Sequence, residues 1–320
     1  MTKPSTVAHG VRHVEVSADA GQRIDNYLIR TLAGVPRSRV YRMLRAGEVR
    51  VNRQRVRPDY RLKAGDRVRV PPWHADVRAP DQVPHSALER IASQVIHEDE
   101  RLIVVDKPAG LAVHGGSGVA FGMIEALRAI YPRGGRLELA HRIDRDTSGL
   151  VLVARGRAAL VELHDAFRER RVAKSYAVLV YGRWQRKLRN VQSPLTRYVT
   201  AGGERRVRVD ADSGKPARTD FEVVAATEAV SWLTAVPQTG RTHQIRVHCR
   251  QAQHAIVGDE KYASDVELDR ARAAGIKRLC LHAATIGVVL DGRKWKFESP
   301  IPAAFTDAWR ALGGGADSTR

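Results

Sequence analysis

Basic charge is concentrated in one short segment of this 320-residue chain, and that concentration constrains the fold more than any other feature. The whole chain has a formal net charge of +19, and residues 21–70 hold fourteen Lys or Arg residues against four acids. More than half of the excess charge therefore lies in about a sixth of the chain. A merely solubilising surface has no reason to concentrate charge in this way, so the segment is predicted to be a module that binds a polyanion. Nucleic acid is favoured over a membrane surface.

The residue pattern of the basic segment also predicts its local structure. Residues 23–32 are predicted to form a short helix, and Pro36 suits the first turn of a second one. In that helix Val40, Met43 and Leu44 make one apolar face, and Gly47 ends it. Further predictions are a strand at 48–51, a turn at 52–53 with a return at 54–56, and a half-buried strand at 67–70, where Arg and Val alternate. Four arginines of the second helix are candidates to contact the polyanion: Arg37, Arg39, Arg42 and Arg45.

The stretches 37–40, 46–52 and 65–66 resemble an S4 domain, a small RNA-binding module, over roughly residues 21–72. The resemblance implies that an Arg-rich helix beside a hairpin follows phosphates and orients the RNA while reading few bases.

The rest of the chain is long enough for a second domain, and 43% hydrophobic residues can supply its core. Pro71 and Pro72 end the basic module. The expected organisation is an N-terminal arm at 1–20, the basic module at 21–72, a linker at 73–94, a second domain at 95–310, and a flexible tail at 311–320.

The compartment is predicted from what the sequence lacks. Two cysteines, Cys249 and Cys280, are too few for a disulfide framework, and no CxxC occurs. Residues 1–10 have no apolar signal core, and no run of about 18 apolar residues could span a membrane. We expect a cytoplasmic monomer.

Three segments of the second domain carry candidate chemistry. The polar loop His141–Gly149 leads into an apolar run that is predicted to be a buried strand, and catalytic residues are often found on loops. Residues 174–182 are predicted to form a strand after a helix at 158–170. In 240–248 Ile245 and Val247 alternate with polar residues, which predicts a half-exposed strand with Arg246 and His248 on its other face.

Together these segments resemble the RluA class of pseudouridine synthases. The resemblance rests on H-R-I-D-x-x-T-S-G around Asp144, K-x-Y at Lys174 and Tyr176, and G-R-T-H-Q-I-R-V-H at 240–248. Further matching blocks lie at 106–110, 113–116, 258–262 and 278–283, so the resemblance covers about residues 95–302. The segment 113–118 and the upstream S4 domain are most similar to the RluC branch, whose members modify large-subunit (23S) ribosomal RNA. The resemblance implies an α+β fold, with a mixed, largely antiparallel sheet and a cleft across its middle.

The resemblance also implies the roles of the site residues. Asp144 is the expected catalytic carboxylate, and Arg246 its ion-pair partner, which keeps it ionised and oriented. Tyr176 is expected to stack on the flipped uracil, Leu281 to form an apolar wall, and Arg142 to hold the flipped nucleotide. The position of Asp146 varies in the family, so Asp146 is expected to face the surface or the RNA. The isomerisation involves no redox change, and no cofactor is expected.

Other functions remain open on the sequence alone. Several His and Cys residues suggest a metal site, but their spacing matches no common zinc pattern. Ser148 suggests a hydrolase, but no nucleophile elbow surrounds it. The main alternative is an RNA-binding assembly factor without catalysis. A structural ribosomal protein would not need a second domain of this size.

Overall fold

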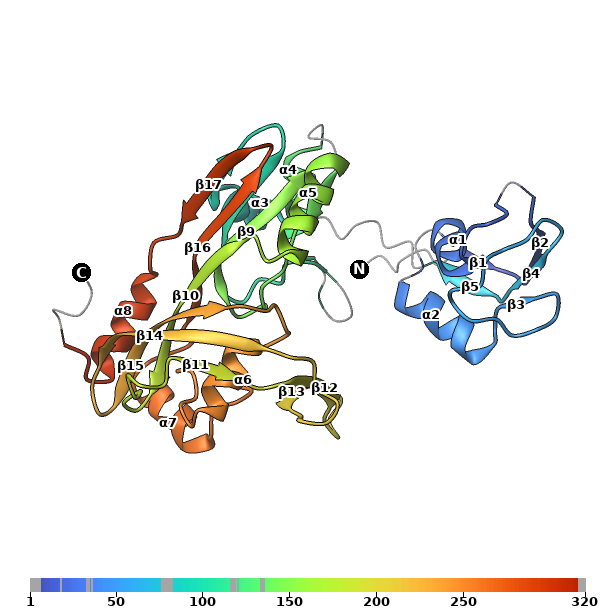
Figure 1. Ribbon diagram of the computed structural model, residues 1–320. Coiled ribbons are helices and arrows are strands. Elements are labelled where there is room, and N and C mark those ends of the chain that lie inside the picture. Colours follow the sequence, from blue (N-terminus) through green and yellow to red (C-terminus); the bar gives the residue numbers. More distant parts are fainter. Residues whose placement is uncertain are drawn as a thin grey trace. The chain divides into compact units, whose positions relative to one another are not determined.

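The computed structural model describes residues 7–17, 19–32, 35, 37–75, 83–115, 119, 121–132 and 136–315, with the backbone alone for 7–9, 37–38 and 74–75. The chain divides into two compact units, Met1–Gln82 and Val83–Arg320 (Figure 1). Each unit has its own hydrophobic core.

The first unit combines two helices with two small sheets. A three-stranded sheet has the order β2-β4-β3, and β1 pairs with β5. Buried residues of both helices, including Leu28 and Met43, pack against Val68 of the sheet. The elements are β1 (Val7–His9), β2 (Arg12–Glu15), α1 (Ile24–Thr31), α2 (Arg37–Ala46), β3 (Arg50–Val51), β4 (Arg67–Val70) and β5 (Trp73–Ala75).

The expected N-terminal arm and linker contain regular structure. Strand β2 pairs with β4 and leads to the buried Val16, so part of the arm completes the sheet of the first unit. Within the expected linker, β5 belongs to the first unit and helix α3 (His85–Ala92) to the second. Ala87 and Ile91, four residues apart, are the buried face of α3. Two apolar residues at this spacing are too few to identify a helix among the polar residues of 73–94.

The second unit is built on a ten-stranded sheet with the order β11-β14-β15-β10-β16-β9-β7-β6, in which β17 also pairs with β16 and β8 with β9. Its strands are β6 (Val95–Glu98), β7 (Leu102–Lys107), β8 (Leu137–Leu139), β9 (Ser148–Arg155), β10 (Ala173–Tyr181), β11 (Asn190–Gln192), β14 (Arg218–Ala226), β15 (Val230–Pro237), β16 (Leu281–Leu290) and β17 (Arg293–Glu298). The pair β9–β16 is parallel and the other described pairs are antiparallel, which confirms the mixed, largely antiparallel sheet of an α+β fold.

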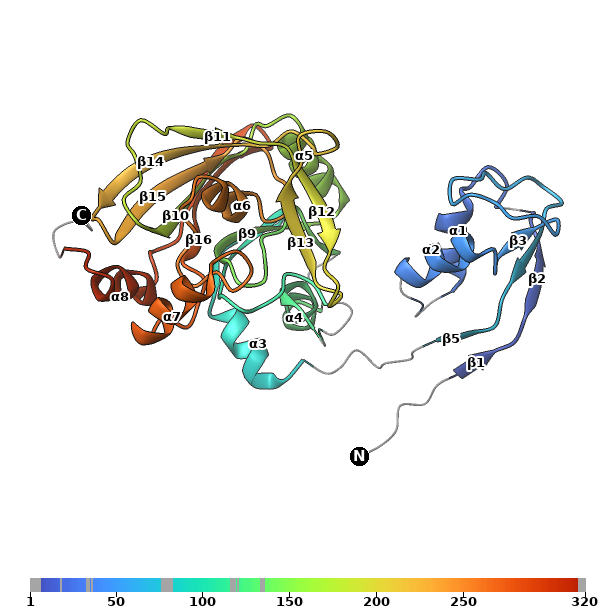
Figure 2. The ribbon, with the colours of Figure 1, turned by 90° about the horizontal axis from the view of Figure 1, so that it is seen from below.

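Helices cover both faces of this sheet, which explains why its central strands are apolar on both sides. Helix α5 (Arg157–Arg168) packs on one face of β9 and α4 (Met123–Ile130) on the other. Helix α8 (Ala303–Ala311) packs on one face of β10 and α6 (Gln244–Gln251) on the other. Helix α7 (Asp265–Ala273) completes the unit, and β12 (Leu195–Val199) and β13 (Arg205–Val209) form a separate hairpin (Figure 2).

The prediction of a strand at 240–248 was wrong, because residues 244–251 form the helix α6. Ile245 and Cys249, four residues apart, pack against β10, and Val247 packs beneath the β12–β13 hairpin. The helix is buried on several sides, so a short alternating pattern could not identify its period. Arg246 and His248 therefore do not share a strand face.

The expected flexible tail begins as ordered structure. Helix α8 continues to Ala311, Leu312 is buried, and the Trp309 indole donates to the carbonyl of Gly315 at 3.0 Å. Residues 316–320 lie outside the described residues.

Candidate active site

A cavity of about 880 Å³ opens at the centre of the second unit. Its walls come from three stretches that are distant in sequence, within 140–147, 167–176 and 236–246, together with Leu281 of β16. The polar loop before β9 contributes Asp144, the start of β10 contributes Tyr176, and the turn after β15 leads to Arg246 on α6. The residues just before β10, at the end of α5 and beyond it, also line the cavity: Phe167, Arg168, Arg170, Arg171 and Val172. The three candidate segments of the sequence therefore meet in one cleft.

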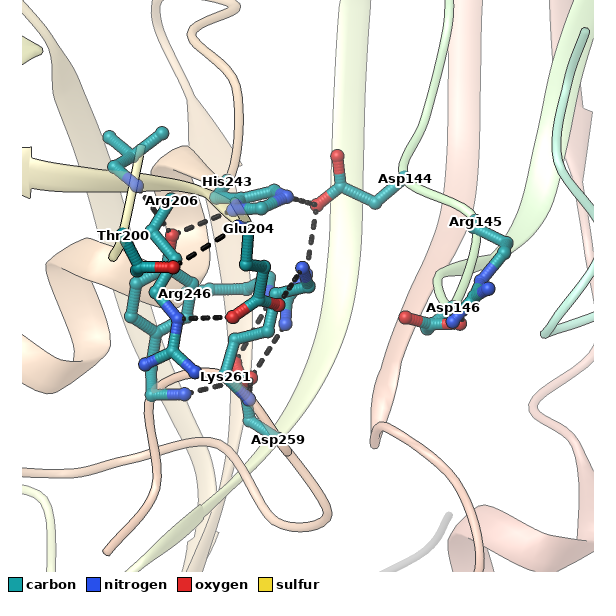
Figure 3. A network of polar contacts seen from close by, with 12 residues as sticks. Asp144, Arg145, Asp146, Thr200, Glu204, Arg206, His243, Arg246, Asp259 and Lys261 are labelled. Carbon is teal, nitrogen blue, oxygen red and sulfur yellow. Dashed lines mark hydrogen bonds and ion pairs between the residues drawn. The ribbon is translucent and has the colours of Figure 1, made fainter. Parts of the chain in front are cut away.

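Asp144 and Arg246, 102 residues apart, form an ion pair in this cleft. Arg246 Nη1 lies 3.4 Å from Asp144 Oδ2. The Arg246 side chain is 3% exposed and is held from behind by Asp259, which is fully buried (Figure 3). Arg246 Nε donates to Asp259 Oδ2 at 2.8 Å, and Nη2 donates to Oδ1 at 2.6 Å. This fork fixes the guanidinium plane and leaves Nη1 for Asp144.

Asp259 is itself oriented by the turn that contains it. Its Oδ1 also accepts from the backbone N–H groups of Lys261 and Tyr262. The preceding Gly258 has φ +73°, and a Cβ there would lie 2.0 Å from the carbonyl oxygen of Arg278. The turn therefore requires glycine before the aspartate. Sequence reasoning noted this block but gave Asp259 no role.

The Asp144 carboxylate is held on one side. His243 Nε2 lies 3.9 Å from the same oxygen, Oδ2, that Arg246 approaches. Among the described residues none donates to Oδ1, so this oxygen is free to meet a substrate. Asp144 is 21% exposed, which leaves it accessible from the cleft.

The loop that carries Asp144 is pinned by a buried lysine. Lys107, at the end of β7, is fully buried, and its Nζ donates to the carbonyls of Pro108, Leu111 and Arg145 at 2.8–2.9 Å. Burial lowers the pKa of Lys107 to about 7, and three carbonyl acceptors favour its charged ammonium form. The N–H of Gly110 also donates to Arg145. The backbone next to Asp144 is therefore fixed from two sides.

The end of the loop is held by the parallel pair β9–β16. Ser148 Oγ accepts from Arg278 Nη2 at 2.5 Å and lies 2.9 Å from Nδ1 of His282. Gly149 has φ +106°, and a Cβ there would lie 2.3 Å from the carbonyl oxygen of Ala283. Ser148 is thus a buried structural residue, which removes the basis for a hydrolase.

The other predicted site residues differ in their surroundings. Tyr176 lines the cavity, and burial together with the charge of Asp144 raises the pKa of its phenol. Leu281 is buried and lines the same cavity, while Arg142 is exposed at its edge. Asp146 pairs with Arg145 at 3.0 Å and has no contact with Arg246 (Figure 3).

Cationic side chains surround the cleft. The Nζ of Lys174 lies 5.9 Å from the centre of the Phe167 ring. Burial lowers the pKa of Lys174. The basic residues that line the cavity, besides Arg246, are Arg142, Arg168, Arg170, Arg171, Lys174 and Arg241. Such a set suits a polyanionic substrate.

The predicted RNA-binding arginines of the first unit lie on α2. Arg42 and Arg45 are exposed, and Arg39 pairs with Glu48 at 3.1 Å. The side chain of Arg37 lies outside the described residues.

The histidines and cysteines suggest no metal centre. Among the described residues there is no group of three or more His, Cys, Asp or Glu side chains that could hold an ion. Cys249 and Cys280 are buried, and His248 lies 2.9 Å from Thr219 Oγ1. In the part of the chain that the structure describes, no helix is long and apolar enough to cross a bilayer.

Sequence comparisons place both units in known families. The RNA pseudouridylate synthase family matches residues 101–251, and the S4 domain family matches residues 22–68. The chain is 47% identical over 315 residues to the ribosomal large subunit pseudouridine synthase C of Salmonella typhimurium, covering 96% of this chain and 98% of that protein. It is also 47% identical to the protein of the same name from Escherichia coli strain K12, covering 92% and 95% of the two chains.

Solved structures share the fold of the second unit. The human RNA pseudouridylate synthase domain containing 4 superposes with a TM-score of 0.59 at 21% identity, covering 71% of this chain and 95% of that one. The human RNA pseudouridylate synthase domain containing 1 gives a TM-score of 0.54 at 28% identity, covering 65% and 82%. The chain therefore belongs to the RNA pseudouridylate synthase family, and it is an RNA pseudouridine synthase of the RluA class with an N-terminal S4 domain.

Proposed function

We propose that this enzyme converts specific uridines of large-subunit (23S) ribosomal RNA to pseudouridine, with Asp144 as the nucleophile. The observation that carries the substrate is the 47% identity, over nearly the whole chain, to two enzymes named for the large ribosomal subunit. The observation that supports the nucleophile is a carboxylate held at one oxygen by Arg246, with its other oxygen open to the cleft.

The reaction breaks the N1–C1′ bond, turns the base, and joins C5 to C1′. The proton on C5 leaves to water and N1 gains one, so no oxidant or reductant is needed. Asp144 reacts with the sugar or the base in its ionised form, and Arg246 orients it. Tyr176 stacks on the uracil, and Leu281 contacts the opposite side of the base. Arg142, at the edge of the cleft, holds the nucleotide outside its helix.

The test is tritium release from ribosomal RNA transcripts labelled at uridine C5. Wild type should release tritium from large-subunit RNA, and Asp144→Asn should release none. Asp146→Asn is the matched control, because Asp146 lies in the same loop without contacting Arg246. It should keep most of the activity. Equal loss in both variants, or loss only in Asp146→Asn, contradicts the assignment.

The first alternative is an assembly factor that binds ribosomal RNA without modifying it. Tight binding without tritium release from large-subunit, small-subunit or transfer RNA would favour that function. Tritium release from small-subunit or transfer RNA alone would support the enzymatic activity but contradict the proposed large-subunit substrate.

We further propose that the enzyme acts as a cytoplasmic monomer, where ribosomal RNA is made and folded. The ribosomal substrate named for its relatives supports the cytoplasmic location. Sedimentation equilibrium at micromolar concentration should give a mass near 35.5 kDa. A mass twice as large would contradict the monomer.

A further inference from the structure

His243 lies between the cleft and the β12–β13 hairpin. Its Nδ1 is 2.7 Å from the hydroxyl of Tyr262, and that hydroxyl accepts from the backbone N–H of Val207 on β13 at 2.9 Å. Its other nitrogen faces Asp144 Oδ2 at 3.9 Å. A chain of polar contacts therefore runs from the hairpin to the nucleophile (Figure 3).

The hydrogen bonds of Tyr262 indicate the tautomer of His243. The Tyr262 oxygen accepts from Val207 N–H, and among the described residues His243 Nδ1 is the acceptor within reach of the phenolic proton. Burial raises the pKa of Tyr262 to about 12, so the phenol keeps this proton. Burial also lowers the pKa of His243, so the imidazole is neutral near pH 7. A neutral imidazole that accepts at Nδ1 carries its proton on Nε2, which faces Asp144.

The backbone holds this ring in an unusual position. His243 has φ +52° and ψ 20°, in the left-handed region that few residues other than glycine occupy, immediately before α6. Lys261, next to Tyr262, pairs with Glu204 of the hairpin turn, so the turn 259–262 is tied to the hairpin a second time. The position of the His243 ring is therefore determined by α6 and by the hairpin together.

We propose that His243 is a positioning residue for Asp144, presenting a neutral N–H that faces Oδ2 at 3.9 Å beside the charged donor of Arg246 at 3.4 Å. Arg246 has one nitrogen left for the carboxylate, 3.4 Å from Oδ2, because its other two are bound to Asp259. Two N–H groups that face one oxygen restrict the direction of Oδ1 more than one does. A neutral donor adds this constraint without adding charge to the cleft. The proposal rests on Asp144 being the nucleophile.

Two substitutions at His243 separate positioning from folding. The amide of Asn overlays Nδ1, so His243→Asn keeps a partner for Tyr262 and tolerates the left-handed backbone, but it cannot reach Asp144. The longer Gln places its amide nitrogen near the position of Nε2. We expect His243→Asn to lower kcat about 10- to 100-fold, as misplacement of a reacting group by about 1 Å does. His243→Gln should restore most of that loss, and KM and the melting temperature should stay within a factor of two and a few degrees of wild type in both.

Asp144→Asn, measured beside them by tritium release, distinguishes the two proposals. If Asp144→Asn is inactive while His243→Asn keeps the wild-type kcat, the role of His243 is wrong and that of Asp144 stands. If Asp144→Asn keeps its activity, the nucleophile itself is misassigned. Equal loss of kcat in the Asn and Gln variants also overturns the proposal, since it would reflect a structural role.

Tyr262→Phe tests the chain of polar groups without changing His243. Loss of the hydroxyl frees Nδ1 to take the proton, which would turn a lone pair toward Asp144. The substitution should lower kcat about tenfold when His243 is present and have little effect in the His243→Gln background. Equal effects in both backgrounds would show that Tyr262 does not act through His243.

Discussion

At the scale of single residues, the site depends on how Arg246 divides its donors. Two of its nitrogens bind the buried Asp259, and the third is left for Asp144. The guanidinium also lies 5.2 Å from the centre of the Tyr262 ring. An arginine packed in this way has a fixed plane, so the geometry of the site depends on Asp259 as much as on Asp144.

Asp259→Asn tests this support. The substitution removes the charge of the buried carboxylate that binds two nitrogens of Arg246, which is expected to reduce the free energy of unfolding by about 3 kcal/mol. Activity should fall as well, because Arg246 loses its orientation. Urea unfolding and tritium release would measure the two effects. Glu260→Gln is the control: Glu260 is exposed in the same turn, so its loss should change the stability by less than about 0.5 kcal/mol.

Burial of His141 predicts how stability varies with pH. The ring accepts the N–H of Leu152 at 2.9 Å, and burial lowers its pKa to about 3. This folded-state value lies below the unfolded value near 6.5, so the unfolded chain binds a proton that the native chain does not. The contribution of His141 to the free energy of unfolding is complete above about pH 6.5 and is lost as the pH falls toward about 3.

The expected result is a stability that falls below about pH 6.5. His141→Gln keeps an acceptor for Leu152 and removes the titration. As the pH falls below about 6.5, the free energy of unfolding of this variant in urea should fall less steeply than that of wild type, by about 1.4 kcal/mol per pH unit. The exposed His164 on α5 provides the control, and His164→Gln should leave the slope unchanged. The pKa values of the half-buried His243 and of the buried His248 and His282 are also lowered by burial, so the free energy of unfolding should keep some pH dependence in every variant.

At the scale of elements, the parallel pair β9–β16 holds the end of the catalytic loop. Gly149 faces Ala283 across this pair, and a Cβ at Gly149 would lie 2.3 Å from the Ala283 carbonyl oxygen, so no side chain fits at position 149. Gly149→Ala should force the strands apart and abolish activity. Gly156→Ala is a matched control, because Gly156 also has positive φ but open space around it. We expect Gly149→Ala to lose about 2 kcal/mol more unfolding free energy than Gly156→Ala. Equal losses would mean that φ alone, and not the close approach, requires glycine.

The elements that the sequence predicted well are those with a clear period. The two helices of the first unit and the strand at 173–181 were confirmed because their apolar spacing is long or their ends are marked. Helix α6 was missed because burial on several sides removes the polar face that marks a helix. Helix α3 was missed because only Ala87 and Ile91 face its core.

The pairing of site residues is also an element-scale property. Asp144 and Arg246 were expected together because of a family resemblance, since no local pattern joins residues so far apart. The supporting residues Lys107, His243, Asp259 and Tyr262 were not predicted. Their partners are backbone groups or side chains of other elements, and a sequence shows neither. The one available signal was a polar block, 258–262, directly after the buried run 255–257.

At the scale of the whole molecule, the charge is divided between two units. We expect the S4 unit to bind phosphates without taking part in the reaction. Replacing Arg42 and Arg45 of α2 by Gln should weaken RNA binding and make the log–log salt dependence shallower by about 0.7–0.9 for each phosphate that is no longer neutralised. The rate at saturating RNA should not change. Arg186→Gln, an exposed arginine of the second unit, is the control for charge alone. An equal effect of that variant on binding would argue against a specific role for α2.

The cationic wall of the cleft has a consequence for what enters it. Arginines and Lys174 line the cavity, whereas Asp144 and the buried Asp259 share one arginine, so these three side chains together carry a negative charge. A nucleotide is negative at its phosphates and neutral at its base. The basic lining therefore attracts the phosphates and the group around Asp144 repels them, while the uncharged base can approach Asp144 without electrostatic opposition. The cleft sorts the two halves of a nucleotide by charge, and the base is oriented toward Asp144 before it touches that carboxylate.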